Sequence, residues 1–238
     1  MMEREKNFGG FFGSVFDVVG RNITAIAIYT LVVGGINGMG MALGLIEVND
    51  NIGGFNIGAT IEQGQSFASV LFTLLGVVVA VVGAYFLLAQ FLRTDGRLGT
   101  SDTRIWAYIG MTLLSGIGFI FGFLLLVIPG IILLVRWSAS SGYLIGKGEG
   151  VVDSLRSSWD ATRGYSWPIF FAGLVLGLLV SIVVGIFVAA AAYAGGTIVL
   201  GFIASLTDAA SNAVYYAFGI GVYSVLNDIS EETAEVFS

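Results

Sequence analysis

The sequence predicts an all-α, polytopic integral membrane protein, a bundle of about six transmembrane helices with two further amphipathic helices at the membrane interface. The 238 residues are 56% hydrophobic and 11% charged, whereas ordinary soluble domains have roughly 45–50% and 25%. The mean hydropathy is +0.92. The apolar residues also fall in runs long enough to cross a hydrocarbon core, which takes about 20 helical residues. These observations exclude a soluble fold.

The first expected element is an amphipathic helix over residues 7–20. Large apolar side chains recur there at intervals of three and four residues, namely Phe8, Phe11, Phe12, Val15, Phe16 and Val19. Small or polar residues fill the other side, namely Gly9, Gly10, Gly13, Ser14 and Asp17. This pattern is typical of a helix that lies in the membrane interface. Such a helix either caps the bundle or responds to lipid.

Six apolar segments then follow as transmembrane spans. They cover residues 23–46, 67–92, 105–128, 129–146, 167–193 and 198–226. The fourth is the shortest and follows the Pro129-Gly130 break, since proline interrupts a continuing helix. Only residues 194–197 separate the last two spans, which predicts a tight antiparallel hairpin. The chain is thus a single membrane domain that ends in an acidic tail, residues 228–238.

A second interfacial helix is expected over residues 150–163, directly before the fifth span. Val152, Leu155 and Trp159 share one side of this helix. Charged residues occupy the other side, namely Asp153, Arg156, Asp160 and Arg163. The segment therefore predicts a second helix that lies on the bundle rather than within it.

The positions of Lys and Arg predict the orientation, because positively charged connections stay in the cytoplasm. All of them except Arg136 precede the first span or lie in the connections 93–104 and 147–163. The connection 47–66 holds three acidic residues and no basic one, so we expect it outside. Both termini are then cytoplasmic.

Small residues at four-residue steps predict how the helices pack, because they let helix backbones approach closely in lipid. The fifth span carries Gly173, Gly177, Ser181 and Gly185, and the sixth carries Gly201, Ser205, Ala209 and Ala213. The stripes favour packing within the chain, and an oligomer interface is the alternative.

Two ionisable residues lie inside otherwise apolar spans, Arg136 in the fourth and Asp208 in the sixth. An intramembrane charge is costly and therefore needs a partner or a purpose. Their expected depths are compatible with contact, and Asn212 and Asn37 could add polar groups nearby. The pair either fixes the register of the helices or forms a mid-membrane site for an anion or a proton.

The sequence also lacks the residues of common catalytic sites. It has no histidine, the commonest general base and metal ligand, and no cysteine. No phosphate-binding glycine loop lies between a strand and a helix. We therefore expect no enzymatic activity, cofactor or metal site. The net charge of −6 argues against nucleic acid as a partner.

Two motifs resemble a known family. The first is the Ile-Pro-Gly break at 128–130 followed by Arg136, and the second is the segment 154–164, with Ser158-Trp159 near its centre and Arg163-Gly164 at its end. They resemble the membrane domain of bacterial glycerophosphodiester phosphodiesterases and its stand-alone relatives. The resemblance implies a six-span bundle of the bacterial inner membrane. The last span of the family tends to end in Tyr-x-x-Leu-Arg, whereas this chain has Tyr223, Leu226 and Asn227, so the final arginine is missing. The histidines of the family's soluble catalytic domain also have no counterpart here.

These observations together favour a non-catalytic scaffold or accessory subunit that organises membrane lipids or partner membrane proteins. The alternative is a small transporter with a polar site around Arg136 and Asp208. A scaffold would depend on the small-residue faces and the interfacial helices, and a transporter on the intramembrane charges.

Overall fold

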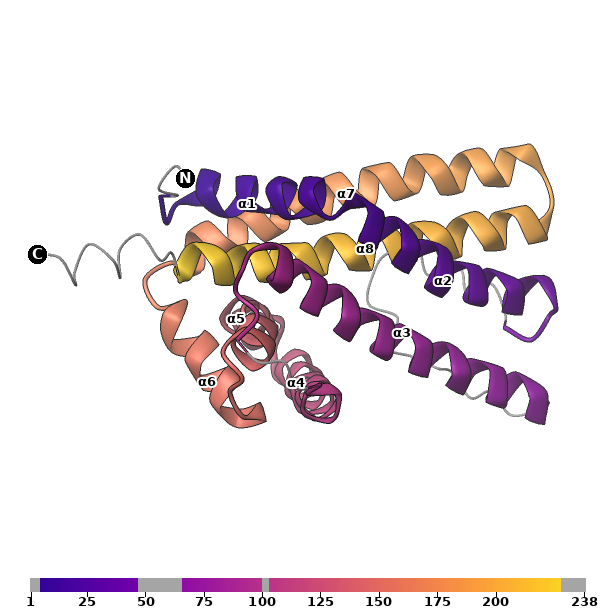
Figure 1. Cartoon of the computed structure of the whole chain (residues 1–238). Coiled ribbons are helices and arrows are strands. Elements are labelled where there is room, and N and C mark those ends of the chain that lie inside the picture. The colour runs from indigo at the N-terminus through magenta and orange to yellow at the C-terminus, as the bar shows by residue number, and fades with distance from the viewer. Residues whose placement is uncertain (1–4, 47–65, 100–102, 228–238) are drawn as a thin grey trace, which may run out of the picture. The chain divides into compact units, whose positions relative to one another are not determined.

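The computed structural model describes residues 5–46, 66–99 and 103–227, and this part of the chain is helical without any strand (Figure 1). It forms two compact units. Unit 1 comprises Met1–Asn22, Leu88–Leu176 and Tyr216–Ser238, and unit 2 comprises Ile23–Leu87 and Gly177–Tyr215. Three helices contribute residues to both units. The predicted acidic tail and nearly all of the connection 47–66 lie outside the described residues.

Five helices are long and apolar enough to cross a membrane. They are α2 (Ile23–Ala42), α3 (Phe67–Thr94), α4 (Ile105–Leu125), α7 (Ser166–Ala194) and α8 (Thr197–Leu226). Each coincides with a predicted span, and all but α2 have ends within three residues of the predicted ones. Many of their large apolar side chains are exposed, as expected for helices surrounded by lipid. The chain is therefore a multi-pass helical membrane protein.

The expected first amphipathic helix forms as α1 (Phe8–Arg21). It begins at Asn7, whose side chain accepts a hydrogen bond of 2.9 Å from the Gly10 amide. One prediction here is wrong, because Ser14 is fully buried rather than on the polar side. Its hydroxyl donates to the Phe11 carbonyl at 2.7 Å, and α8 presents Gly221 to it. A satisfied hydroxyl against a glycine can be buried at little cost.

The expected fourth span is not one continuous helix. It consists of α5 (Val127–Arg136) and a π-helical turn, η1 (Gly142–Gly146), which are separated by an irregular stretch. Close contacts pair this segment with α4 in antiparallel order. A Cβ added to Gly122 would lie 3.1 Å from Gly130 Cα, Gly118 faces Trp137, and Gly99, before α4, faces the Gly146 carbonyl. The segment therefore returns to the end of the hairpin from which α4 began.

The second amphipathic helix forms as α6 (Val151–Ala161), within unit 1. Of the apolar residues assigned to one side of this helix, Leu155 is buried and Val152 is 65% exposed. The buried side of α6 is instead completed by two serines, Ser154 and Ser158. Ser154 lies against α4, where its hydroxyl is 3.7 Å from the Met111 sulfur. The inner face of α6 is therefore more polar than the sequence pattern predicted.

Candidate functional site

The break between α5 and η1 is held by a side chain from α6. The fully buried Ser158 donates to the Arg136 carbonyl at 2.7 Å and accepts from the Ala139 amide at 3.2 Å. Both backbone groups lie at the point where the regular helix ends. A buried peptide group without a partner is costly, and a single hydroxyl here satisfies two of them. The sequence pattern gave no sign of this role for Ser158.

Arg136 is also held by α6. Its guanidinium carbon lies 5.3 Å from the centre of the Trp159 ring, and its Nη1 donates to the Trp159 carbonyl at 3.4 Å. A guanidinium over an indole face is a favourable cation–π arrangement. The cation therefore has a partner within its own unit. This interaction was not predicted, since Trp159 was assigned only to the apolar side of its helix.

A buried ion pair joins the ends of three helices in unit 1. Asp95, directly after α3, lies with its Oδ1 2.7 Å from Arg21 Nη1 at the end of α1, and its Oδ2 accepts from the Ser224 hydroxyl of α8 at 2.9 Å. The Asp95 side chain is 5% exposed and that of Arg21 is 38% exposed. Sequence reasoning missed Asp95, because an acid in a turn between two arginines resembles a solvated connection.

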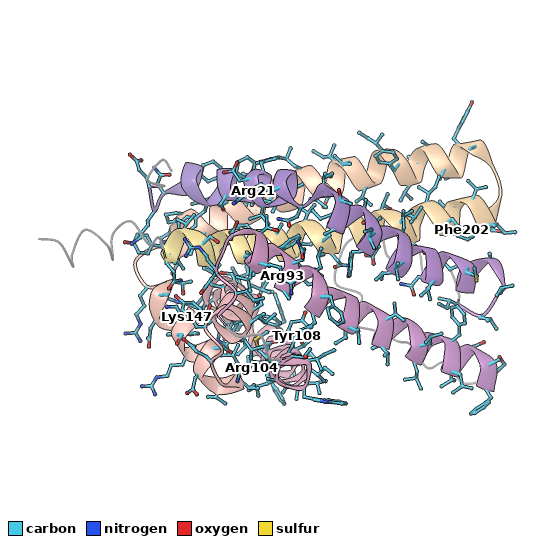
Figure 2. The ribbon with its side chains drawn as sticks, viewed as in Figure 1. Arg21, Arg93, Arg104, Tyr108, Lys147 and Phe202 are labelled. Carbon is cyan, nitrogen blue, oxygen red and sulfur yellow. The ribbon has the colours of Figure 1, made fainter. Side chains whose placement is uncertain are left out.

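The last turn of α8 is fixed by a second polar cluster. The Arg97 guanidinium donates to the Asn227 carbonyl, and a cation at a helix C-terminus is favourable. The Asn227 side chain donates to the Tyr143 hydroxyl of η1 at 2.9 Å. The side chain of Lys147, a residue labelled in Figure 2, has its Nζ 5.0 Å from the centre of the Tyr143 ring. Arg97 thus places a positive charge at the C-terminal end of α8.

The remaining predicted polar residues belong to unit 2. Asp208, near the middle of α8, is exposed and accepts a hydrogen bond of 3.2 Å from the Asn212 amide. The Asn37 Oδ1 lies 2.9 Å from the position of a Cβ on Gly76 of α3. Arg136 belongs to unit 1, so its pairing with Asp208 stays a prediction. Unit 2 contains no Lys or Arg at all, since all ten fall within unit 1.

The small-residue stripe of α8 is buried along its whole length, at Gly201, Ser205, Ala209 and Ala213. In unit 2, α2 packs beside the stripe: a Cβ on Gly34 would lie 2.9 Å from the Ser205 carbonyl oxygen, and Gly38 lies against the ring of the neighbouring Phe202, which is labelled in Figure 2. A Cβ on Gly34 would be only 2.8 Å from Leu206 Cα. The burial of these four residues is what packing within the chain requires, and the use of the stripe for packing stays a prediction.

The stripe of α7 is only partly used. Gly173 lies against the Phe218 ring, and Gly177 is close to the Tyr215 hydroxyl. Ser181 is exposed, and so is Ala189, which continues the stripe one four-residue step beyond Gly185. No described atom lies within 4 Å of a Cβ added to Gly185. The second half of this stripe is therefore an open surface of small residues.

Within the described ranges, no three His, Cys, Asp or Glu side chains are grouped closely enough to hold a metal ion. The polar clusters consist mainly of arginines, amides and hydroxyls that bind backbone groups. Their chemistry is that of helix fixation.

Comparisons with known proteins give no match for this chain. No protein-family model matches it, and neither a curated protein nor a solved structure is significantly similar.

Proposed function

We propose that this chain is a non-catalytic scaffold or accessory subunit of the bacterial inner membrane, which organises partner membrane proteins or lipids. The observation that carries the proposal is the open half of the α7 stripe, at Ser181, Gly185 and Ala189. Small faces of this kind let a second helix approach closely in lipid. The corresponding stripe of α8 is already occupied by helices of the same chain, which leaves α7 for a partner.

The arrangement of charges supports an orientation with both termini in the cytoplasm. Every Lys and Arg belongs to unit 1, including those that flank the hairpin of α4, α5 and η1. The Arg104 guanidinium, before α4, donates to the Leu144 carbonyl of η1 at 3.3 Å. The hairpin therefore begins and ends at the same end, which supports placing the connections 93–104 and 147–163 on the same side of the membrane. The resemblance of the 128–164 motifs to the phosphodiesterase membrane domain supports the same architecture.

Two substitutions test the proposed surface. Ala189→Leu fills the open stripe, whereas Ala190→Leu adds the same volume about 100° away around the helix. Both alanines are exposed, so neither change should disturb the fold. We expect proteins that copurify with the wild-type chain in native lipid nanodiscs to be lost from Ala189→Leu and kept by Ala190→Leu, as measured by quantitative mass spectrometry. Identical profiles for the two variants would contradict the proposal.

Transport is the second candidate function, and the exposed carboxylate of Asp208 favours it. A charge near the middle of a 30-residue helix, in a unit without Lys or Arg, marks a candidate intramembrane site. Asp208→Asn distinguishes the two functions. A transporter that uses this carboxylate loses flux while its fold stays intact, whereas a scaffold keeps its partners.

A further inference from the structure

Helix α1 has two separate apolar sides. One side packs within unit 1, where Phe11, Val15 and Val18 are at most 1% exposed. Phe11 meets the Tyr165 ring edge-on at 6.4 Å between ring centres. This side accounts for the attachment of α1 to its unit.

The other side is a row of three phenylalanines at four-residue steps. The Phe8 and Phe12 rings are stacked at 5.6 Å, and Phe12 meets Phe16 at 5.1 Å. Phe8 is 40% and Phe16 is 55% exposed, and Phe12 between them is half-buried, so the described part of the chain leaves the row partly uncovered. Ordered aromatic rings in water would forfeit a large hydrophobic gain. Some apolar partner must therefore cover them.

The chain itself indicates lipid as that partner. Only Asn22 separates the end of α1 from Ile23, the first residue of the candidate span α2, and Ile23 is 60% exposed. The row therefore lies on the segment that leads directly into the membrane. We propose that Phe8, Phe12 and Phe16 insert into the phospholipid leaflet at the entry of α2 and bind its acyl chains. This inference deepens the lipid side of the proposed function and rests on it only in requiring a membrane-embedded chain.

The chemistry of α1 further indicates that this binding does not depend on lipid charge. Between Phe8 and Arg21 the helix has two charged residues, Asp17 and Arg21. The Arg21 cation is already paired with Asp95. The side next to the phenylalanines carries glycines, of which Gly13 and Gly20 face open space. Without free cations on α1, anionic headgroups add little to the interaction, and apolar insertion provides it.

Site-directed spin labelling tests the proposal on the full chain, which has no native cysteine. Phe12→Cys and Phe16→Cys place a nitroxide on the row. Gly13→Cys is the matched control, one residue from Phe12 and about 100° around the helix. Each labelled protein is reconstituted in vesicles of phosphatidylcholine and in vesicles that also contain phosphatidylglycerol. Collision with oxygen, which concentrates in lipid, is compared with collision with a water-soluble nickel chelate.

We expect the oxygen-to-nickel ratio at Phe12 and Phe16 to exceed that at Gly13 severalfold, and equally in both vesicle types. A high nickel accessibility on the row would place it in water and overturn the proposal. Labels shielded from both reagents would show that protein covers the row, which also overturns it. A ratio that rises only with phosphatidylglycerol would refute charge independence. Phe16→Trp provides a variant that keeps an aromatic ring and should therefore fold. Brominated acyl chains should quench a larger fraction of the tryptophan fluorescence in this variant than in the wild type. These outcomes do not depend on the partner test on α7: if Ala189→Leu and Ala190→Leu gave identical copurification profiles, the lipid contact of α1 would still be tested independently.

Discussion

The buried ion pair of unit 1 predicts unequal effects for the loss of its two members. Asp95 is 5% exposed and is paired with Arg21, whereas Arg21 is 38% exposed and can turn to water. Arg21→Met leaves a buried carboxylate without its cation and should cost about 2–4 kcal/mol of unfolding free energy, somewhat below the value for a fully buried pair. Asp95→Asn keeps an acceptor for the Ser224 hydroxyl and should cost about 1–2 kcal/mol.

The assay is equilibrium unfolding of the purified chain in mild detergent by titration with dodecyl sulfate. The fluorescence of the four tryptophans reports the transition. The double variant Arg21→Met with Asp95→Asn should be close in stability to Asp95→Asn alone, because an amide no longer needs the cation. The reasoning fails if Arg21→Met is the milder substitution. It also fails if the two single losses simply add, since the pair would then behave like an exposed one.

Three further predictions concern the other contacts of unit 1, and the same unfolding titration measures the first and the last. Gly142→Ala should destabilise the chain by about 2–3 kcal/mol, because the new Cβ would lie 2.6 Å from the Cβ of Tyr223 on α8. Gly116→Ala is the control: it lies in open space and should be neutral or stabilising. Equal effects would show that the contact can relax. Arg97→Ala should speed amide hydrogen exchange in the last turn of α8, and unchanged exchange would mean that the cap does not hold this turn. Arg136→Lys should lower the free energy of unfolding by about 1 kcal/mol, because an ammonium loses the planar stack on Trp159. The same substitution in a Trp159→Leu background should then have no effect on stability.

The long spans could be predicted from the sequence because their signal is local. A run of apolar residues that exceeds the thickness of the hydrocarbon core predicts a spanning helix whatever its neighbours are. The buried stripe of α8 was predictable for the same reason, since its residues follow one helix face. Ser14 was assigned wrongly, and the exposure of Val152 could not be foreseen, because both depend on the partner surface. Gly221 admits Ser14, and Val152 has no cover on α6.

The break in the fourth span could not be predicted, because its cause lies outside the segment. An apolar run of 18 residues predicts a continuous helix as long as every peptide group bonds within it. Here Ser158, from the next helix, takes over the Arg136 carbonyl and the Ala139 amide. The hydroxyls of Ser138 and Ser140 also bind carbonyls three residues earlier. Such side chains compete with regular helical bonding, and their effect depends on tertiary contacts.

The two charges that the sequence places inside apolar segments, Arg136 and Asp208, therefore differ in their partners. Arg136 has an indole face and a carbonyl from α6, so its cost is offset within unit 1 whether or not it meets Asp208. Asp208 has only the Asn212 amide among the described contacts, and its unit contains no basic residue. A counter-charge for it must come from unit 1, from another molecule or from a bound proton. Arg136→Met distinguishes the first source from the others. If Arg136 neutralises Asp208, Arg136→Met should lower the free energy of unfolding by more than the loss of the stack on Trp159 explains. Adding Asp208→Asn to that variant should then recover the extra loss.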